Sequence, residues 1–220
     1  MGSSNASFSL LELFSMGGIF MWPLLVFSVA TIAITLERAI FLLYHNLKLS
    51  DLKKKVEEAI QNGNIAETKE YLSKQTRRRM GARILLALVN NAAHSEHLLE
   101  KAVEAEAMSC IASLENGFNF LTALGSLSPL TGFLGTVSGM IGAFRSIAEA
   151  VDVNAQIVAN GIYEALITTV FGLIIAIIAM SAHSLFANTV DKFASDVEIV
   201  CSELIIEIGN SRETAENKGQ

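Results

Sequence analysis

Among the polar side chains in and beside the apolar stretches in the second half of this 220-residue chain, four could serve an ion path: Thr136, Glu164, Thr168 and Thr169. Hydroxyl and carboxyl groups donate and accept hydrogen bonds, so together they could form a hydrated polar track for an ion. Glu164 lies twelve residues after Asp152, which is about 18 Å along a helix. A carboxylate at that depth in a membrane costs a few kcal/mol, so we expect it to have a role.

Structural alternatives remain open for these residues. Glu164 could be protonated, or hydrogen-bonded to a neighbouring helix as structural glue, and a mid-helix threonine often bonds back to its own backbone. The track is also incomplete, because the chain has no aspartate deep inside an apolar stretch. If the set carries protons, the missing proton carrier is expected to come from a partner.

Other kinds of chemistry find little support. The sequence contains no phosphate-binding P-loop, zinc-protease or nucleophile-elbow motif and no paired carboxylates, so no enzyme activity is predicted. A net charge of −6 argues against a nucleic acid partner. Cys110 and Cys201 lie far apart without metal-ligand spacing. We therefore expect two free thiols, no metal and no cofactor.

Three long uncharged stretches must position the polar residues. Residues 13–36 and 116–144 contain no charged residue, and 165–190 contain only His183 as an ionisable group. At 24, 29 and 26 residues, each exceeds the roughly 20 that a helix needs to cross a hydrocarbon core. No strand-like alternation appears. With 51% hydrophobic and 17% charged residues, the chain is predicted to be an all-α integral membrane protein with three transmembrane helices.

The distribution of basic residues predicts the orientation. Eleven of the sixteen Lys and Arg residues lie in 45–118 and none in 1–18, so the N-terminus is expected outside and the C-terminus inside. The run Arg77 to Arg79 fits a retention signal or a contact with anionic lipid. The predicted segments are an interfacial amphipathic segment (1–18), transmembrane helix 1 (19–44), a cytoplasmic helical domain (45–115), transmembrane helix 2 (116–145), a periplasmic loop (146–152), transmembrane helix 3 (153–188) and a cytoplasmic helix with a disordered tail (189–220).

Small residues mark one face of the second and third spans. They recur every three or four residues, which lets two helix backbones approach closely in lipid. The predicted helix-packing residues are Gly132, Gly135, Gly139, Gly142, Gly161 and Gly172. Apolar residues also continue at helical spacing from Leu99 to Leu121 and from Phe193 to Ile208. This predicts one unbroken helix entering the second span and another leaving the third.

The motifs of all three spans resemble one known family. SLSPLTGFLGTVSGMIGAF in the second span and GIYEALITTVFGLIIAI in the third are similar to the MotA/TolQ/ExbB proton-channel family, most of all to its ExbB branch. GIFMWPLLVFSVATIAITLERAIFL over the first span is similar to the ExbB pattern as well. The segment between the first two spans matches in length and helical character. ExbB-like chains often carry APGI where this chain has Ala159 to Ile162, which affects only how the third helix begins.

The resemblance implies an assembly and a mechanism. In this family five copies of a three-span subunit surround two single-span partner helices, each with a membrane aspartate, and ion flow drives work across the periplasm. It implies for this chain a homopentamer in the bacterial inner membrane, in contact with membrane lipid, with an ExbD-like partner and a TonB-like protein. The implied function is an ion-driven motor subunit that energises outer-membrane transport. A TolQ-like role in cell-envelope maintenance and a passive membrane scaffold are the alternatives, whereas MotA-like stators have four spans.

The resemblance also implies roles for the polar residues. Thr136 matches the pore-facing threonine of the GTV motif, Thr169 matches the threonine of the third span, and Glu164 matches the family's glutamate. Thr136 and Thr169 would hydrate or hydrogen-bond the partner's aspartate, and Glu164 would shape the field in the pore. Thr168 stands where sodium-driven flagellar relatives tend to have threonine and proton-driven ones alanine, so both ions remain candidates.

Overall fold

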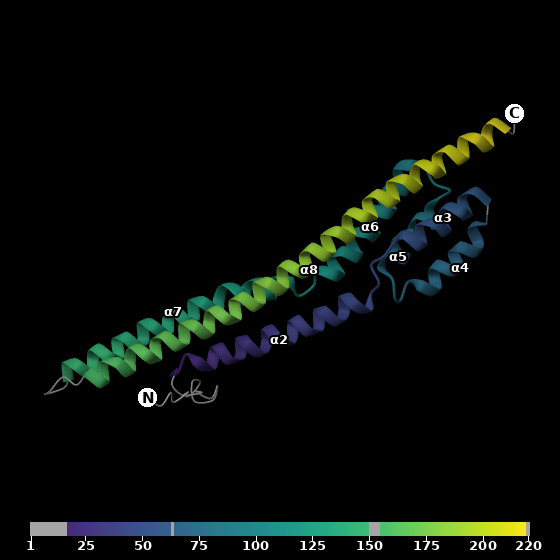
Figure 1. Ribbon diagram of the computed structural model, residues 1–220. Coiled ribbons are helices and arrows are strands. Elements are labelled where there is room, and N and C mark those ends of the chain that lie inside the picture. Colours follow the sequence, from purple (N-terminus) through teal and green to yellow (C-terminus); the bar gives the residue numbers. More distant parts are fainter. Residues whose placement is uncertain (1–16, 63, 150–154, 219–220) are drawn as a thin grey trace, which may run out of the picture. The chain divides into compact units, whose positions relative to one another are not determined.

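The chain folds into helices only, as far as the structure describes it. The computed structural model describes residues 17–62, 64–149 and 155–218, and no strand occurs in these ranges. Most of the predicted segment 1–18 and part of the predicted loop 146–152 lie outside them. The helices, labelled in Figure 1, are α2 (Met21–Tyr44), α3 (Ser50–Asn62), α4 (Ile65–Gln75), α5 (Met80–Asn91), α6 (Glu96–Glu115), α7 (Phe118–Glu149) and α8 (Ala155–Lys218).

Three helical stretches are long and apolar enough to cross a membrane. They are Met21–Tyr44, the stretch Glu96–Glu149 that contains α6 and α7, and Ala159–Arg212 within α8. The prediction of an all-α membrane protein with three spans is thereby confirmed. α8 continues without interruption to Lys218, although a disordered tail was predicted for the end of the chain. Its apolar face continues beyond the third span through Phe193, Val197 and Leu204, all buried.

The prediction of one unbroken helix into the second span is wrong. α6 ends at Glu115, α7 begins at Phe118, and Gly117 between them has φ +88°. A left-handed residue just after a helix end is a common helix stop, and glycine adopts it without a steric penalty. The apolar pattern still runs across the break, because Leu114 before it and Phe118 after it are both buried.

The chain divides into two compact units, which are described separately. The span unit comprises residues up to Glu37 and Gly117–Ser184, and the polar unit comprises Arg38–Asn116 and the chain from Leu185 onward. In the span unit α2 packs on α8 through a cluster of Met21, Leu24, Ile167 and Ile175. Only 17% of the apolar window of α2 is buried, against 44% for α8. Most of the apolar surface of α2 is therefore left for lipid or for other chains.

Charged pairs join the helices of the polar unit around an apolar core. Leu52, Leu72, Leu88, Leu99 and Leu204 are buried there. Arg83 of α5 binds Glu106 of α6 at 2.6 Å, and Lys53 of α3 pairs with Glu203 of α8. Arg79 lies 3.6 Å from Asp51, so one member of the Arg77–Arg79 run has a structural partner. This run separates α4 from α5, a boundary that the sequence pattern did not predict.

Both cysteines of the polar unit are buried free thiols. Burial raises the pKa of Cys110 from the ordinary value of 9.0 to about 11 and the pKa of Cys201 to about 12. The neutral thiol is therefore favoured in the folded state. This contribution to stability is fully present below pH 9 and is lost as the pH rises through about 11 and 12, because the unfolded thiols ionise first.

We expect both thiols to resist alkylation in the folded protein. A rise of two pKa units lowers the thiolate fraction at pH 7.5 about 100-fold, and the thiolate is the reactive form. N-ethylmaleimide labelling followed by mass spectrometry measures the rate. Ser109→Cys, at an exposed position next to Cys110, is the control and should label at least about tenfold faster. Equal rates for Cys110 and the introduced cysteine would contradict the burial.

Candidate functional site

α7 and α8 lie backbone against backbone in the span unit. A methyl group at Gly132 would lie 2.8 Å from the carbonyl oxygen of Thr168, and one at Gly172 would lie 2.5 Å from the carbonyl oxygen of Ser128. At Gly139 the corresponding distance to the carbonyl oxygen of Gly161 is 3.0 Å. These separations leave no room for a β-carbon. The glycines thus permit the close helix contact that membrane packing favours.

The remaining predicted glycines divide into two groups. A methyl group at Gly161 would lie 2.6 Å from the β-carbon of Ala143, and one at Gly135 would collide with the side chain of Thr168. Both therefore belong to the contact between α7 and α8. Gly142 is the exception, because no atom lies within 4 Å of the position of its missing β-carbon. Gly142 is exposed, so within the described part of the chain it has no packing contact with α8.

Thr168 and Thr169 meet α7 at a single carbonyl group. The hydroxyl of Thr169 donates to the carbonyl oxygen of Gly132 at 3.2 Å. The hydroxyl of Thr168 lies 3.2 Å from the same oxygen and 2.8 Å from the carbonyl oxygen of Ala165 on its own helix. Thr168 is 1% exposed, whereas Thr169 is only partly buried. The two neighbours therefore differ: Thr168 lies inside the helix contact and Thr169 lies at its edge.

Thr136 and Glu164 lie elsewhere in the span unit. The hydroxyl of Thr136 donates to the carbonyl oxygen of Phe133 in its own helix at 2.7 Å, one of the alternatives left open by the sequence. Glu164 lies one turn before Thr168 on α8 and is partly buried. Within the described ranges its carboxylate has no hydrogen bond or ion pair. The structure thus brings Thr168 and Thr169 together at Gly132, but gives Thr136 and Glu164 no direct link to them.

Gly18 lies against the side chain of Glu164. It has φ +64°, and a β-carbon there would collide with the Glu164 carboxylate. The carbonyl oxygen of Gly18 accepts a hydrogen bond from the backbone of Met21 at 3.2 Å, at the start of α2. The turn that leads into the first span therefore lies directly against the partly buried carboxyl group of Glu164 in the third. Sequence reasoning missed this contact, because it joins residues far apart in the chain and has no local sequence signal.

We expect Gly18→Ala to destabilise the span unit and to displace the Glu164 carboxylate. An L-residue with left-handed φ costs about 1–2 kcal/mol before any collision is counted. Thermal unfolding of the detergent-extracted chain measures the loss. Gly209→Ala is the matched control, because Gly209 is helical and has open space around it. There alanine should stabilise by about 0.5–1 kcal/mol, so two losses of equal size would refute the explanation.

Two buried hydroxyls on α2 form a further candidate set that sequence reasoning missed. Thr31 is 1% exposed, and the hydroxyl oxygens of Thr31 and Thr35 are buried without a hydrogen-bond partner in the described part of the chain. Most mid-helix hydroxyls here bond back to their own helix, as Thr131 does to the carbonyl oxygen of Leu127 at 2.9 Å. Thr31 and Thr35 are four residues apart and so share one helix face, which is the sequence signal that could have revealed them.

No metal centre accompanies these residues. Over residues 17–62, 64–149 and 155–218, no three His, Cys, Asp or Glu side chains come together as possible ligands. The predicted site residues Thr136, Glu164, Thr168 and Thr169 offer three hydroxyls and one carboxyl group, beside the backbone carbonyl of Gly132. Such groups suit hydrogen bonding and proton exchange with a further polar group.

The sequence matches a known protein family and several of its members. The chain matches the family model of the MotA/TolQ/ExbB proton channel family over residues 52–199. It is 32% identical over 210 residues to a putative biopolymer transport protein, ExbB-like 1, from Synechocystis, covering 89% of this chain and 80% of that protein. It is 29% identical over 203 residues to the biopolymer transport protein exbB1 of Vibrio cholerae, covering 86% and 84%.

A relative named TolQ matches a shorter segment of this chain. The Tol-Pal system protein TolQ of Haemophilus influenzae is 42% identical over 86 residues, which cover 39% of this chain and 38% of that protein. Its name differs from those of the relatives in Synechocystis and Vibrio, but the family model includes both kinds. Since that model matches more than half of the chain, and a relative above 30% identity covers most of it, the chain belongs to the MotA/TolQ/ExbB proton channel family.

Proposed function

We propose that this chain is an ExbB-like subunit of a proton-driven motor in the bacterial inner membrane. With an ExbD-like single-span partner, it would convert the ion-motive force into mechanical work for TonB-dependent transport across the outer membrane. The observation that carries the proposal is the contact at Gly132, where the partly buried hydroxyl of Thr169 lies at the edge of two closely packed helices. Names of the relatives in Synechocystis and Vibrio support the biopolymer transport role.

The proton carrier in this proposal belongs to the partner. The predicted site residues offer three hydroxyls and one carboxyl group, and the uncharged stretches of the sequence contain no aspartate. A membrane aspartate of a single-span partner would supply the group that gains and loses the proton. Thr169 and Thr136 would hydrogen-bond or hydrate it, and Glu164 would set the local field, because a charge acts strongly in a low dielectric.

The position of Thr168 favours a proton over sodium. Its hydroxyl is 1% exposed and lies within hydrogen-bonding distance of two backbone carbonyl oxygens. A sodium ion needs several oxygen ligands at once, so Thr168 would have to leave the helix contact to serve as one. A proton needs only a relay of exchangeable groups. Output that persists in sodium-free buffer and collapses with a protonophore would agree with the proton.

A TolQ-like role in maintaining the cell envelope is the second candidate. It is supported by the 42% identity to the Haemophilus TolQ over 86 residues. Both roles use the same kind of ring and the same kind of partner, so they differ in the partner chains rather than in the polar residues. A passive scaffold is the remaining alternative, and it would tolerate Glu164→Gln and Thr169→Val together.

The first experiment is the native mass of the detergent-extracted chain, alone and co-expressed with a candidate single-span partner. We expect a ring of five subunits with the N-terminus outside and the C-terminus inside, which takes up two partner chains. Native mass spectrometry gives the stoichiometry, and protease accessibility in oriented vesicles gives the orientation. A monomer or dimer whose mass does not change with the partner would reject the motor and favour the scaffold.

A further inference from the structure

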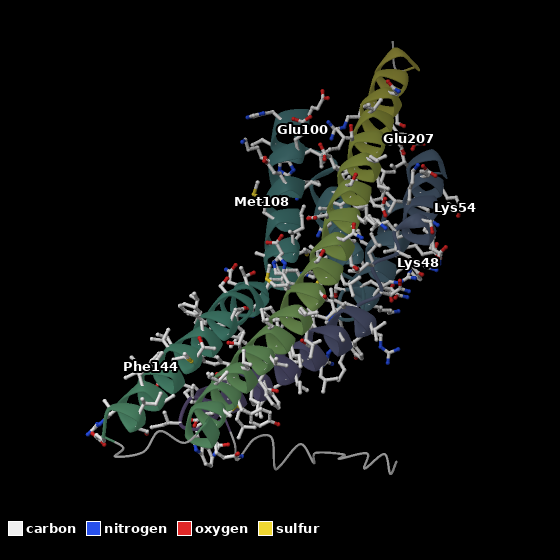
Figure 2. The ribbon with its side chains drawn as sticks, turned by 60° about the vertical axis from the view of Figure 1, so that its left-hand side comes forward. Lys48, Lys54, Glu100, Met108, Phe144 and Glu207 are labelled. Atoms are coloured by element: carbon white, nitrogen blue, oxygen red, sulfur yellow. The ribbon has the colours of Figure 1, made fainter. Side chains whose placement is uncertain are left out.

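An apolar cavity of about 200 Å³ is lined by residues of the polar unit alone. Helix α3 contributes Val56 and Ile60, α5 contributes Val89, and the end of α8 contributes Ile208. Among the described residues that line it, Ser211 and Arg212 are the polar ones. Figure 2 shows this part of α8, where Glu207 is labelled, beside α3, which carries Lys54.

Arg212 gives the cavity one directed polar group. One terminal nitrogen of its guanidinium, Nη1, donates to the carbonyl oxygen of His94 at 2.7 Å. The other, Nη2, is buried and has no hydrogen-bond partner within the described part of the chain. The bond to His94 holds the planar group in place, so the N–H bonds of Nη2 have a defined direction. A buried donor without an acceptor is costly, and a guanidinium keeps its charge at all physiological pH values.

The combination of an apolar wall and one unpaired cationic donor indicates the chemistry of a ligand. Pockets for small molecules are mostly apolar, with a few polar groups that fix the orientation of the ligand. A carboxylate is a strong acceptor for a guanidinium, since both partners are ionised, and it is the anionic group that a short alkyl chain commonly carries. An apolar cavity of about 150 Å³ can hold benzene, so about 200 Å³ corresponds to roughly eight carbon atoms.

We propose that this cavity binds a short aliphatic carboxylate of about six to eight carbon atoms. The carboxylate accepts a hydrogen bond from Nη2 of Arg212, and the alkyl chain lies among Val56, Val89 and Ile208. The volume of about 200 Å³ matches one such chain. Because α3, α5 and α8 all contribute to the cavity, a bound carboxylate also stabilises the packing of the polar unit. This site is independent of the motor proposal.

Binding of octanoate to the full chain in lipid nanodiscs tests the proposal by isothermal titration, with empty nanodiscs subtracted. We expect saturable binding at one site per chain, and at least tenfold weaker binding in Arg212→Gln. Octanol, which fills the cavity without a charge, should bind the wild type and Arg212→Gln equally. Acetate, which has the carboxylate alone, should not bind. Arg145→Gln is the matched control, because Arg145 is an exposed arginine that pairs with Glu149 at 2.9 Å, and it should leave octanoate binding unchanged.

A second variant covers the case in which Arg212→Gln disturbs the fold. Val89→Phe places extra volume in the cavity and should abolish the binding of both octanoate and octanol, while the native mass of the chain stays the same. Three results would overturn the proposal. Octanoate could still bind to Val89→Phe, it could bind to Arg212→Gln as strongly as to the wild type, or its binding could fail to saturate. The native mass experiment reports on the motor separately, so either proposal can fail alone.

Discussion

Gly172→Val is expected to force α7 and α8 apart and to destabilise the chain by about 3 kcal/mol or more. Over-packing typically costs about 1–3 kcal/mol when side chains can move aside. Here the obstacle is backbone, since a β-carbon at residue 172 would lie 2.5 Å from the carbonyl oxygen of Ser128 and 3.3 Å from the α-carbon of Gly132. A shift of α7 would also break the hydrogen bond from Thr169 to Gly132. The thermal midpoint of the detergent-extracted chain measures the effect.

Gly142→Val is the matched control for this experiment. It makes the same chemical change in α7, but no atom lies within 4 Å of the position that its β-carbon would take. Gly142 is itself exposed. The thermal midpoint of Gly142→Val should therefore stay close to that of the wild type. Equal losses in the two variants would mean that the glycines act through helix propensity rather than through helix contact.

The three spans could be predicted from the sequence because their signal is long and local. Uncharged stretches of 24, 29 and 26 residues leave a helix across lipid as the only stable conformation. The break at Gly117 could not be predicted in the same way, since buried Leu114 and Phe118 continue the apolar pattern across it. The start of α5 was missed for a related reason: Arg77 to Arg79 indicated membrane topology, although they also separate two helices.

The candidate site was predictable only as far as helix periodicity reaches. Spacings of three and four residues placed Gly132, Gly139 and Gly172 on packing faces, and the structure puts all three against a neighbouring backbone. Periodicity cannot show where a neighbouring helix leaves a face uncovered, so it gave Gly142 the same role. Contacts between distant parts of the chain, such as Gly18 against Glu164, depend on how the helices assemble and have no local sequence signal.

Thr169→Val is expected to lower energised output at least tenfold while the complex still assembles. Valine has nearly the shape of threonine, and the change removes a hydrogen bond between helices, which in membrane proteins is worth only about 0.6 kcal/mol on average. Stability should therefore change little. In the proposed function the partly buried hydroxyl serves the partner's aspartate, so its loss stops proton transfer. TonB-dependent uptake measures the output, and native mass measures the assembly with the partner.

Thr168→Val is the matched control, because it removes a hydroxyl from the adjacent residue and the same helix contact. Thr168 is 1% exposed, and its hydroxyl lies near the carbonyl oxygens of Gly132 and Ala165, so an ion has no access to it. Its loss should lower the thermal midpoint modestly and leave the output per assembled complex close to that of the wild type. If Thr169→Val kept full output, the hydroxyl would have no part in proton transfer. If it instead prevented assembly, the residue would be structural, and the polar track would have to begin from Thr136 and Glu164 alone.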